Sequence, residues 1–200
     1  MAAAEHTVHE PLSGPDVPRT IGTDASRRVL RFVAMFRAAI GTTTLLIALG
    51  FPVAPILGTS NPELFFATAA IYSIFALLIL ALQWQHPVLL PRLALLEMAA
   101  DVLAVTLLMH ASGGIRSGIG GLLVVFVGAA SLTLRGRQAF FAAALAALAV
   151  LMEQSFSFLE RTTPSSEFLA AGVLGAIIFM IASAAWPLAR RLEESEALAR

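Results

Sequence analysis

Five polar side chains stand inside long apolar stretches, where few neighbours can satisfy them. Glu97 and Asp101 are four positions apart, so a helix places both carboxylates on one face. His110 closes the same stretch, and Glu153 and Gln154 stand together in a later one. An ionisable group at membrane depth costs about 2.5–3.5 kcal/mol or more. Each of these residues therefore needs a partner or a cavity.

The residues alone leave three roles open for this set. It is an ion or proton pathway, a binding site for a partner helix, or a group of interhelical hydrogen bonds worth about 0.6 kcal/mol each. Glu97 and Asp101 repel each other when both are ionised, so we expect at least one to hold a proton. His110 and Glu153 are expected at similar depths, and we hypothesise a hydrogen bond between them.

Catalytic and metal-binding patterns are not found in the sequence. It contains no GxxxxGK[ST], GxSxG or HExxH motif and no cysteine, and these would signal nucleotide binding, acyl transfer, zinc or thiol chemistry. Four histidines, His6, His9, His86 and His110, have unrelated spacings, which is not a metal-ligand pattern. We therefore expect no catalytic residue, no cofactor and no metal, and the chain by itself is not expected to be an enzyme.

The elements that position these side chains follow from the composition. The chain has 200 residues, of which 58% are hydrophobic and 13% charged, and its mean hydropathy is +0.83. Soluble domains carry about 25% charged residues, so this is a polytopic membrane protein whose first partner is the lipid bilayer. The net charge is zero and no basic run occurs, which excludes a nucleic-acid partner.

Six segments are long enough to cross a bilayer. A hydrocarbon core of about 30 Å needs about 20 apolar residues in a helix. We predict an all-α bundle with spans at 33–54, 63–83, 92–111, 117–134, 138–159 and 167–188. With the N-terminus in the cytoplasm, only Arg116 and Arg161 of the 13 basic residues lie outside, and Arg37 is among those inside. This positive-inside pattern predicts that both termini are cytoplasmic.

The two ends of the chain differ in character. Residues 1–26 are polar and are expected to be a disordered cytoplasmic tail, which leaves 27–188 as the membrane domain. Residues 189–200 read as the start of a cytoplasmic signalling helix. Its exit from the membrane is marked by Ser183, Pro187, Arg190 and Arg191. Because Pro187 removes one backbone donor, we expect a kink there.

Four stretches together carry a resemblance to a known family. They are HASGGIRSGIGGLL from His110 to Leu123, which includes Gly113 and Gly114, LMEQ at 151–154, AGVLG at 171–175 and ARRLEESEALA at 189–199. With the preceding Asp101, they resemble the membrane portion of PilS-type sensor histidine kinases over roughly residues 27–199. Any one stretch alone is not specific.

The resemblance implies a signal-input role in the bacterial inner membrane. In that family the bundle precedes a PAS domain and the dimerising, ATP-binding kinase domains, and the kinase partners an NtrC-like response regulator that controls type IV pilin transcription. The implied input is pilin itself, sensed by contact between its transmembrane helix and the bundle. A homodimer is implied as well. We expect the chain to be either an excised input module or a standalone relative, so autophosphorylation is not carried over.

Under this reading the candidate signal or partner-binding residues are Glu97, Asp101, His110, Gly113, Gly114, Glu153 and Gln154. Three alternatives stay open. Redox- or quinone-responsive six-span sensors share a Gly-Gly turn but continue with an NPF-like sequence, whereas this chain continues with Ile115 to Gly118. A small ion- or proton-coupled transporter would use Glu97, Asp101 and Glu153. A structural membrane subunit would bind no ligand.

Overall fold

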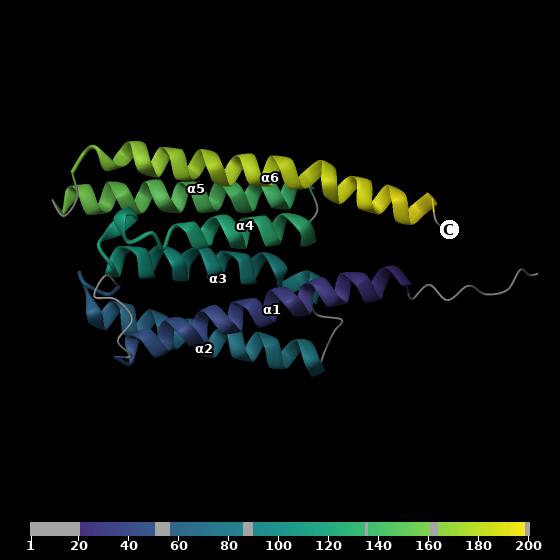
Figure 1. The fold of residues 1–200 in the computed structure, drawn as a ribbon, viewed down its shortest axis with the longest axis horizontal. Helices are drawn as coiled ribbons and strands as arrows, with labels where there is room; N and C mark the ends of the chain where they lie inside the picture. Colours follow the sequence, from purple (N-terminus) through teal and green to yellow (C-terminus); the bar gives the residue numbers. More distant parts are fainter. Residues whose placement is uncertain (1–20, 51–56, 86–89, 135, 161–163, 199–200) are drawn as a thin grey trace, which may run out of the picture.

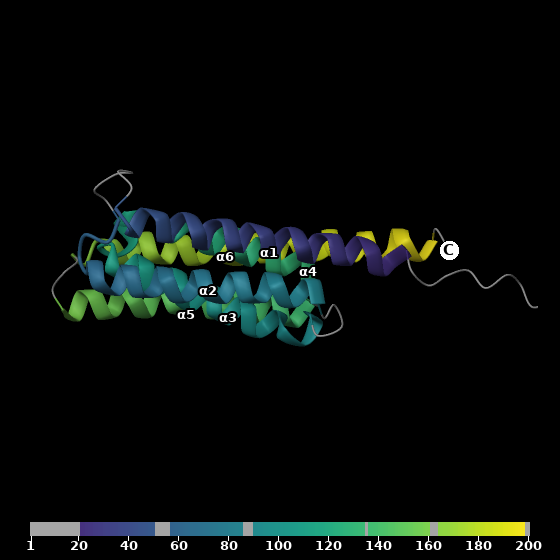
Figure 2. The ribbon, with the colours of Figure 1, turned by 90° about the horizontal axis from the view of Figure 1, so that it is seen from below.

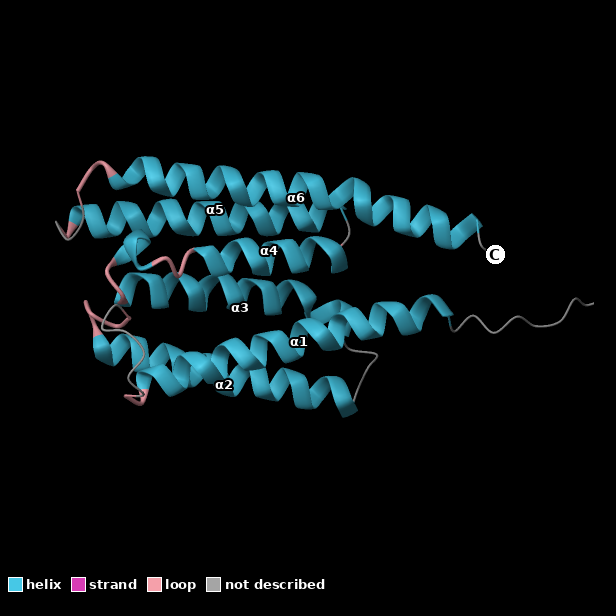
Figure 3. Ribbon diagram, in the orientation of Figure 1, coloured by secondary structure: helices cyan, strands magenta, loops and turns pink. Residues whose placement is uncertain are grey.

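The computed structural model describes residues 21–50, 57–85, 90–134, 136–160 and 164–198. Within these ranges the chain forms six α-helices and one short 3₁₀ helix, with no strand (Figure 3). The elements in order are α1 (Ile21–Ala48), α2 (Pro62–Gln85), α3 (Leu90–Ala111), η1 (Gly114–Ser117), α4 (Gly121–Thr133), α5 (Gly136–Leu159) and α6 (Glu167–Leu198). The expected all-α membrane bundle is confirmed.

Five of the described helices contain a segment long and apolar enough to cross a membrane. These segments are Arg31–Ala48, Pro62–Gln85, Ala94–Ala111, Arg137–Leu159 and Glu167–Ala185. The fourth expected span, 117–134, is shorter than predicted, because α4 begins only at Gly121 and has 13 residues. At 1.5 Å per residue it covers about 20 Å, less than a hydrocarbon core of about 30 Å. The residues before α4 form η1 and a turn at Gly118, whose φ is 74°.

The helices pack as three neighbouring hairpins (Figure 1). The α1–α2 hairpin lies at one edge, α3 and α4 lie in the middle, and α5–α6 lies at the other edge. Seen from below, α1, α4 and α6 form one layer and α2, α3 and α5 the other (Figure 2). Helix α1 packs closely along α2 but only loosely against α4.

Small residues bring the helices of the edge hairpin α5–α6 together. Ala142, Ala146 and Ala171 are fully buried. A Cβ atom added to Gly175 would lie 3.4 Å from the Cβ of Ala147, an ordinary van der Waals contact. Close backbone approach of this kind is how helices gain packing energy in a membrane, where lipid tails are as apolar as the side chains.

The start of α1 and the end of α6 extend from the same end of the bundle, beyond the other helices (Figures 1 and 2). We call this the terminal end, and the opposite end, which carries η1, the η1 end. Helix α1 begins at Ile21, inside the segment expected to be a tail. Helix α6 runs without interruption through Pro187 to Leu198, so the missing donor of Pro187 does not end the helix.

Candidate functional site

A buried ion cluster joins three helices near the middle of the bundle. Arg37 of α1 donates from Nε to Asp101 Oδ2 at 2.7 Å and from Nη1 to Glu97 Oε2. Tyr72 of α2 donates its hydroxyl to Asp101 Oδ1 at 2.8 Å. The Arg37 and Glu97 side chains are 7% and 6% exposed, and that of Asp101 is fully buried. We call these four residues the Arg37 cluster.

Arg37 was counted among the basic residues of the inner side, and in the structure its side chain is buried within the bundle. Its guanidinium turns inward and bridges the two carboxylates on α3. The i, i+4 spacing places Glu97 and Asp101 one helical turn apart on one face, and the forked guanidinium donates to both at once. The repulsion that predicted a protonated carboxylate is therefore offset by a cation.

A second polar cluster lies towards the η1 end of α3. His110 Nδ1 is 3.4 Å from Glu153 Oε1 on α5, as hypothesised. Ser157, one turn further along α5, donates to the same Glu153 oxygen at 2.7 Å and lies 3.4 Å from His110 Nδ1. The ring of Phe156 meets the imidazole edge-to-face at 5.6 Å. This group ties α3 to α5, and Gln154 beside it is fully buried.

The two clusters are separate. Asp101 and His110 are nine residues apart on α3, which is about 14 Å along a helix. Within the described residues, the side chains between them on the buried face of α3 are apolar, with Val105 and Leu108 buried. The five polar residues that the sequence singled out are thus divided between two interhelical junctions. Among the described residues, no group of three metal-ligating side chains gathers at either junction.

The glycine turn after α3 binds residues 58–61, which directly precede α2. Gly113 and Gly114 adopt φ angles of 89° and 80°, a region that side chains with a Cβ avoid. The turn presents the Ala111 carbonyl and the Ser112 hydroxyl. Residues 58–61 donate backbone hydrogen bonds to both groups. Gly113 and Gly114 therefore contribute by adopting the backbone angles that this turn requires.

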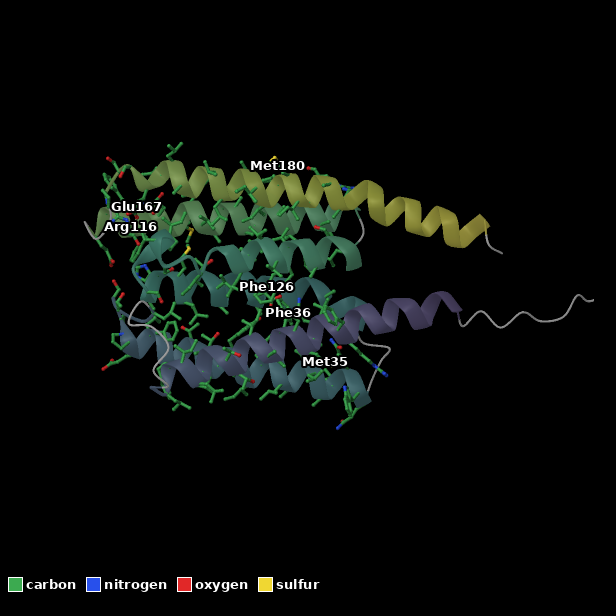
Figure 4. The ribbon with its side chains drawn as sticks, viewed as in Figure 1. Met35, Phe36, Arg116, Phe126, Glu167 and Met180 are labelled. Carbon is green, nitrogen blue, oxygen red and sulfur yellow. The ribbon has the colours of Figure 1, made fainter. Side chains whose placement is uncertain are left out.

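An ion pair that the sequence analysis did not anticipate lies at the η1 end. Arg116 of η1 pairs through Nε with Glu167 at the start of α6, and Figure 4 shows the two side chains meeting there. The Glu167 side chain is buried, while that of Arg116 is exposed. Arg116 directly precedes the predicted span 117–134, and Glu167 is the first residue of the predicted span 167–188. Charges are ordinary at span ends, so nothing in the sequence indicated that these two residues pair.

The exit from the bundle was expected to involve Ser183, Pro187, Arg190 and Arg191. Ser183 donates its hydroxyl to the Phe179 carbonyl one turn earlier at 2.8 Å, a bond within α6. Pro187, Arg190 and Arg191 lie on the helix, and their side chains lie outside the described residues.

An apolar pocket of about 330 Å³ lies between α1 and α4, and its lining on α1 begins at Phe36, the residue before Arg37. Its walls include the α1 side chains from Phe36 to Ile47, together with Phe65, Leu108 and Leu122. Next to it, Phe36 meets Phe126 of α4 edge-to-face at 6.2 Å, which Figure 4 shows near the centre of the bundle. We call this feature the α1–α4 pocket.

The fold and these sites define a polytopic helical membrane domain that carries buried interhelical charge and a long helix leaving the bundle. The model of the PilS-like transmembrane domain matches residues 20–199, and the chain belongs to this family. It is 34% identical over 179 residues to the Sensor protein kinase PilS of Pseudomonas aeruginosa, covering 90% of this chain and 33% of that protein. The chain therefore spans about a third of the length of this sensor kinase. No solved structure matches it.

Proposed function

We propose that this chain is the signal-input module of a PilS-type sensor kinase. It senses type IV pilin in the inner membrane by helix–helix contact and relays this to a kinase output that controls pilin transcription. The observation that carries the proposal is the match to the PilS-like transmembrane domain over residues 20–199. The printed name of the Pseudomonas relative, a sensor protein kinase, supports the kinase output.

The shape of the bundle supports an input role. Helix α6 runs on as one helix to Leu198 and extends from the terminal end (Figure 1). A continuous helix carries a tilt or rotation from the membrane to whatever follows it. In the proposed orientation the terminal end faces the cytoplasm, as the arginine distribution favours. Under this proposal the response regulator acts only through the kinase part, and the working unit is a homodimer.

The α1–α4 pocket supports a partner helix as the input. Its walls are mostly apolar, and side chains of a helix packed against α1 and α4 can insert into it. In a membrane such contacts rest on van der Waals packing. A pilin helix shifts the bundle only if it binds one arrangement more tightly than another. We place Glu97 and Asp101 in this response because Arg37, their partner, directly follows Phe36, which lines the pocket.

The test is a pilin-promoter reporter in cells whose only PilS-type kinase is this chain fused to the kinase part of the Pseudomonas relative. We expect output to change when pilin is deleted. We expect Glu97→Asp and Asp101→Glu to perturb the response less than Glu97→Leu and Asp101→Leu, because the former keep a carboxylate for Arg37. The exposed Glu63, changed to leucine, is the control.

Three results would count against this function. Output that ignores pilin would remove pilin as the input. Equal output from the charge-preserving and apolar variants would remove Glu97 and Asp101 from the mechanism. Output that follows quinone depletion instead of pilin would favour the quinone-responsive class.

A further inference from the structure

The α1–α2 hairpin is built as one piece. A Cβ atom added to Gly41 would lie only 3.2 Å from the Ser73 Cα, so the two helix backbones are in close contact there. The Ser73 hydroxyl donates to the Gly41 carbonyl of the other helix at 2.6 Å. Both the glycine and the serine are buried. Close packing with a buried hydrogen bond resists sliding of α1 along α2.

This hairpin is attached to α3 through backbone groups at the η1 end. The Ser60 and Asn61 amides both donate to the Ala111 carbonyl at 3.0 Å. The Gly58 amide donates to the Ser112 hydroxyl at 3.0 Å, and Gly58 itself has a φ of 70°. These bonds fix the position of residues 58–61 on the α3 turn. Short segments with one or two permissive residues are where hinge motion is absorbed.

Nearer the terminal end, the attachment is made by charged and polar side chains. Arg37 and Tyr72 belong to the hairpin, and Glu97 and Asp101 belong to α3. Every hydrogen bond of the Arg37 cluster that joins these residues therefore crosses the boundary between the hairpin and the rest of the bundle. Removing one member of a buried charge cluster is costly because it leaves the other charges unpaired. The cluster therefore favours the closed position of the hairpin as long as all its members are present.

Between the two attachments, the hairpin meets the rest of the bundle on two sides: α2 packs against α3, whereas α1 has little contact with α4. The α1–α4 pocket occupies part of the space between α1 and α4. Packed cores resist continuous deformation, but a boundary that contains a pocket of about 330 Å³ is not fully packed. On the α1 side, the boundary is therefore weakest between the Arg37 cluster and residues 58–61.

We propose that the α1–α2 hairpin is a hinged unit of the bundle, with residues 58–61 on the α3 turn as the hinge and the Arg37 cluster as the latch. When the latch is broken, the hairpin swings away from α3 at the latch and stays in place at the hinge. Because α1 begins and α6 ends at the terminal end (Figure 2), this swing changes the spacing of the two helices that leave the bundle. This motion does not depend on which partner binds the bundle.

Distances between spin labels in the full chain, reconstituted in lipid nanodiscs, test this directly. The sequence contains no cysteine, so labels attach only where cysteines are introduced. Met35→Cys with Met180→Cys reports on the latch side, and Figure 4 shows these two residues on opposite edges of the bundle. Phe66→Cys with Leu169→Cys reports on the hinge side. All four positions are exposed.

The latch variant is Arg37→Gln, and the matched control is Arg31→Gln, which removes the same charge from an exposed position of α1. We expect Arg37→Gln to lengthen the Met35–Met180 distance by about 5 Å, the scale of one helical turn. The Phe66–Leu169 distance should stay unchanged, and Arg31→Gln should alter neither distance.

Two results would overturn the proposal. An unchanged Met35–Met180 distance in Arg37→Gln would show that the cluster is not a latch. Equal changes in both distances would show general loosening without a hinge. If Arg37→Gln does not fold, Tyr72→Phe removes only one hydroxyl of the cluster, and a smaller lengthening of the same distance is expected. No lengthening in Tyr72→Phe would then refute the latch.

Discussion

Replacing Arg37 with methionine removes the cation from the buried cluster while keeping an unbranched side chain. The change deletes the hydrogen bonds to Glu97 and Asp101 and leaves two carboxylates whose side chains are 6% and 0% exposed. Breaking a buried ion pair on one side costs about 3–5 kcal/mol. We expect a loss near the lower end, about 3 kcal/mol, because the carboxylates can bind protons to relieve the unpaired charge.

The assay is unfolding in mixed micelles by titration with sodium dodecyl sulfate, followed by circular dichroism. Arg31→Met, at an exposed position of the same helix, is the control and should change the free energy of unfolding by no more than about 0.5 kcal/mol. Adding Asp101→Asn to Arg37→Met removes one unpaired carboxylate. The double variant should therefore be less destabilised than the sum of the single variants, by about 1.5 kcal/mol.

The reasoning is refuted if Arg37→Met costs only about 0.6 kcal/mol, the average of an interhelical hydrogen bond in a membrane protein. The cluster would then be ordinary helix packing. Strict additivity of the Arg37 and Asp101 changes would refute it as well, because the two residues would not be coupled in the folded bundle.

Two further predictions concern the η1 end. Gly120→Ala should destabilise the bundle by about 1 kcal/mol, the lower end for overpacking, because its Cβ would lie 2.7 Å from Leu174 Cδ2, the end of a side chain that can rotate away. Gly121→Ala, where nothing lies within 4 Å, should be tolerated. The same micelle unfolding measures both variants, and equal effects would contradict the contact. A double-mutant cycle of His110→Ala and Glu153→Ala should give a coupling of about 0.6 kcal/mol, and strictly additive losses would show that the 3.4 Å contact contributes nothing.

Composition and segment length predicted the class of fold well. The thickness of the bilayer sets the length that an apolar segment needs to cross it, and five of the described helices contain a segment of that length. The short α4 was not predicted, because residues 117–120 count as apolar in a hydropathy window, whereas in the structure the 3₁₀ helix and the left-handed Gly118 delay the start of α4 until Gly121. A left-handed Gly118 and a 3₁₀ turn are local backbone choices that hydropathy does not report.

The polar sites could be predicted only in part. Glu97 and Asp101 were recognisable because carboxylates are costly in lipid, and the depth argument paired His110 with Glu153. Arg37 was missed because an arginine near a span end is usually an inner-boundary anchor. Whether the Arg37 side chain points into the bundle depends on which face of α1 is turned toward α3. The prediction of spans does not determine how the helices are rotated relative to one another. One signal was available in the sequence. Two carboxylates in one predicted span need a positive charge nearby, and Arg37 is a basic residue inside the first predicted span.

The central claim is that the bundle recognises a type IV pilin helix within the membrane, and energy transfer in liposomes tests it most directly. A donor is placed on the chain at Leu159→Cys, an exposed position, and an acceptor on the pilin. The account predicts transfer that saturates with pilin and is reduced by unlabelled pilin, but not by an unrelated apolar single-span helix of equal length. Transfer no greater than that of the unrelated helix, with no competition by unlabelled pilin, would contradict it.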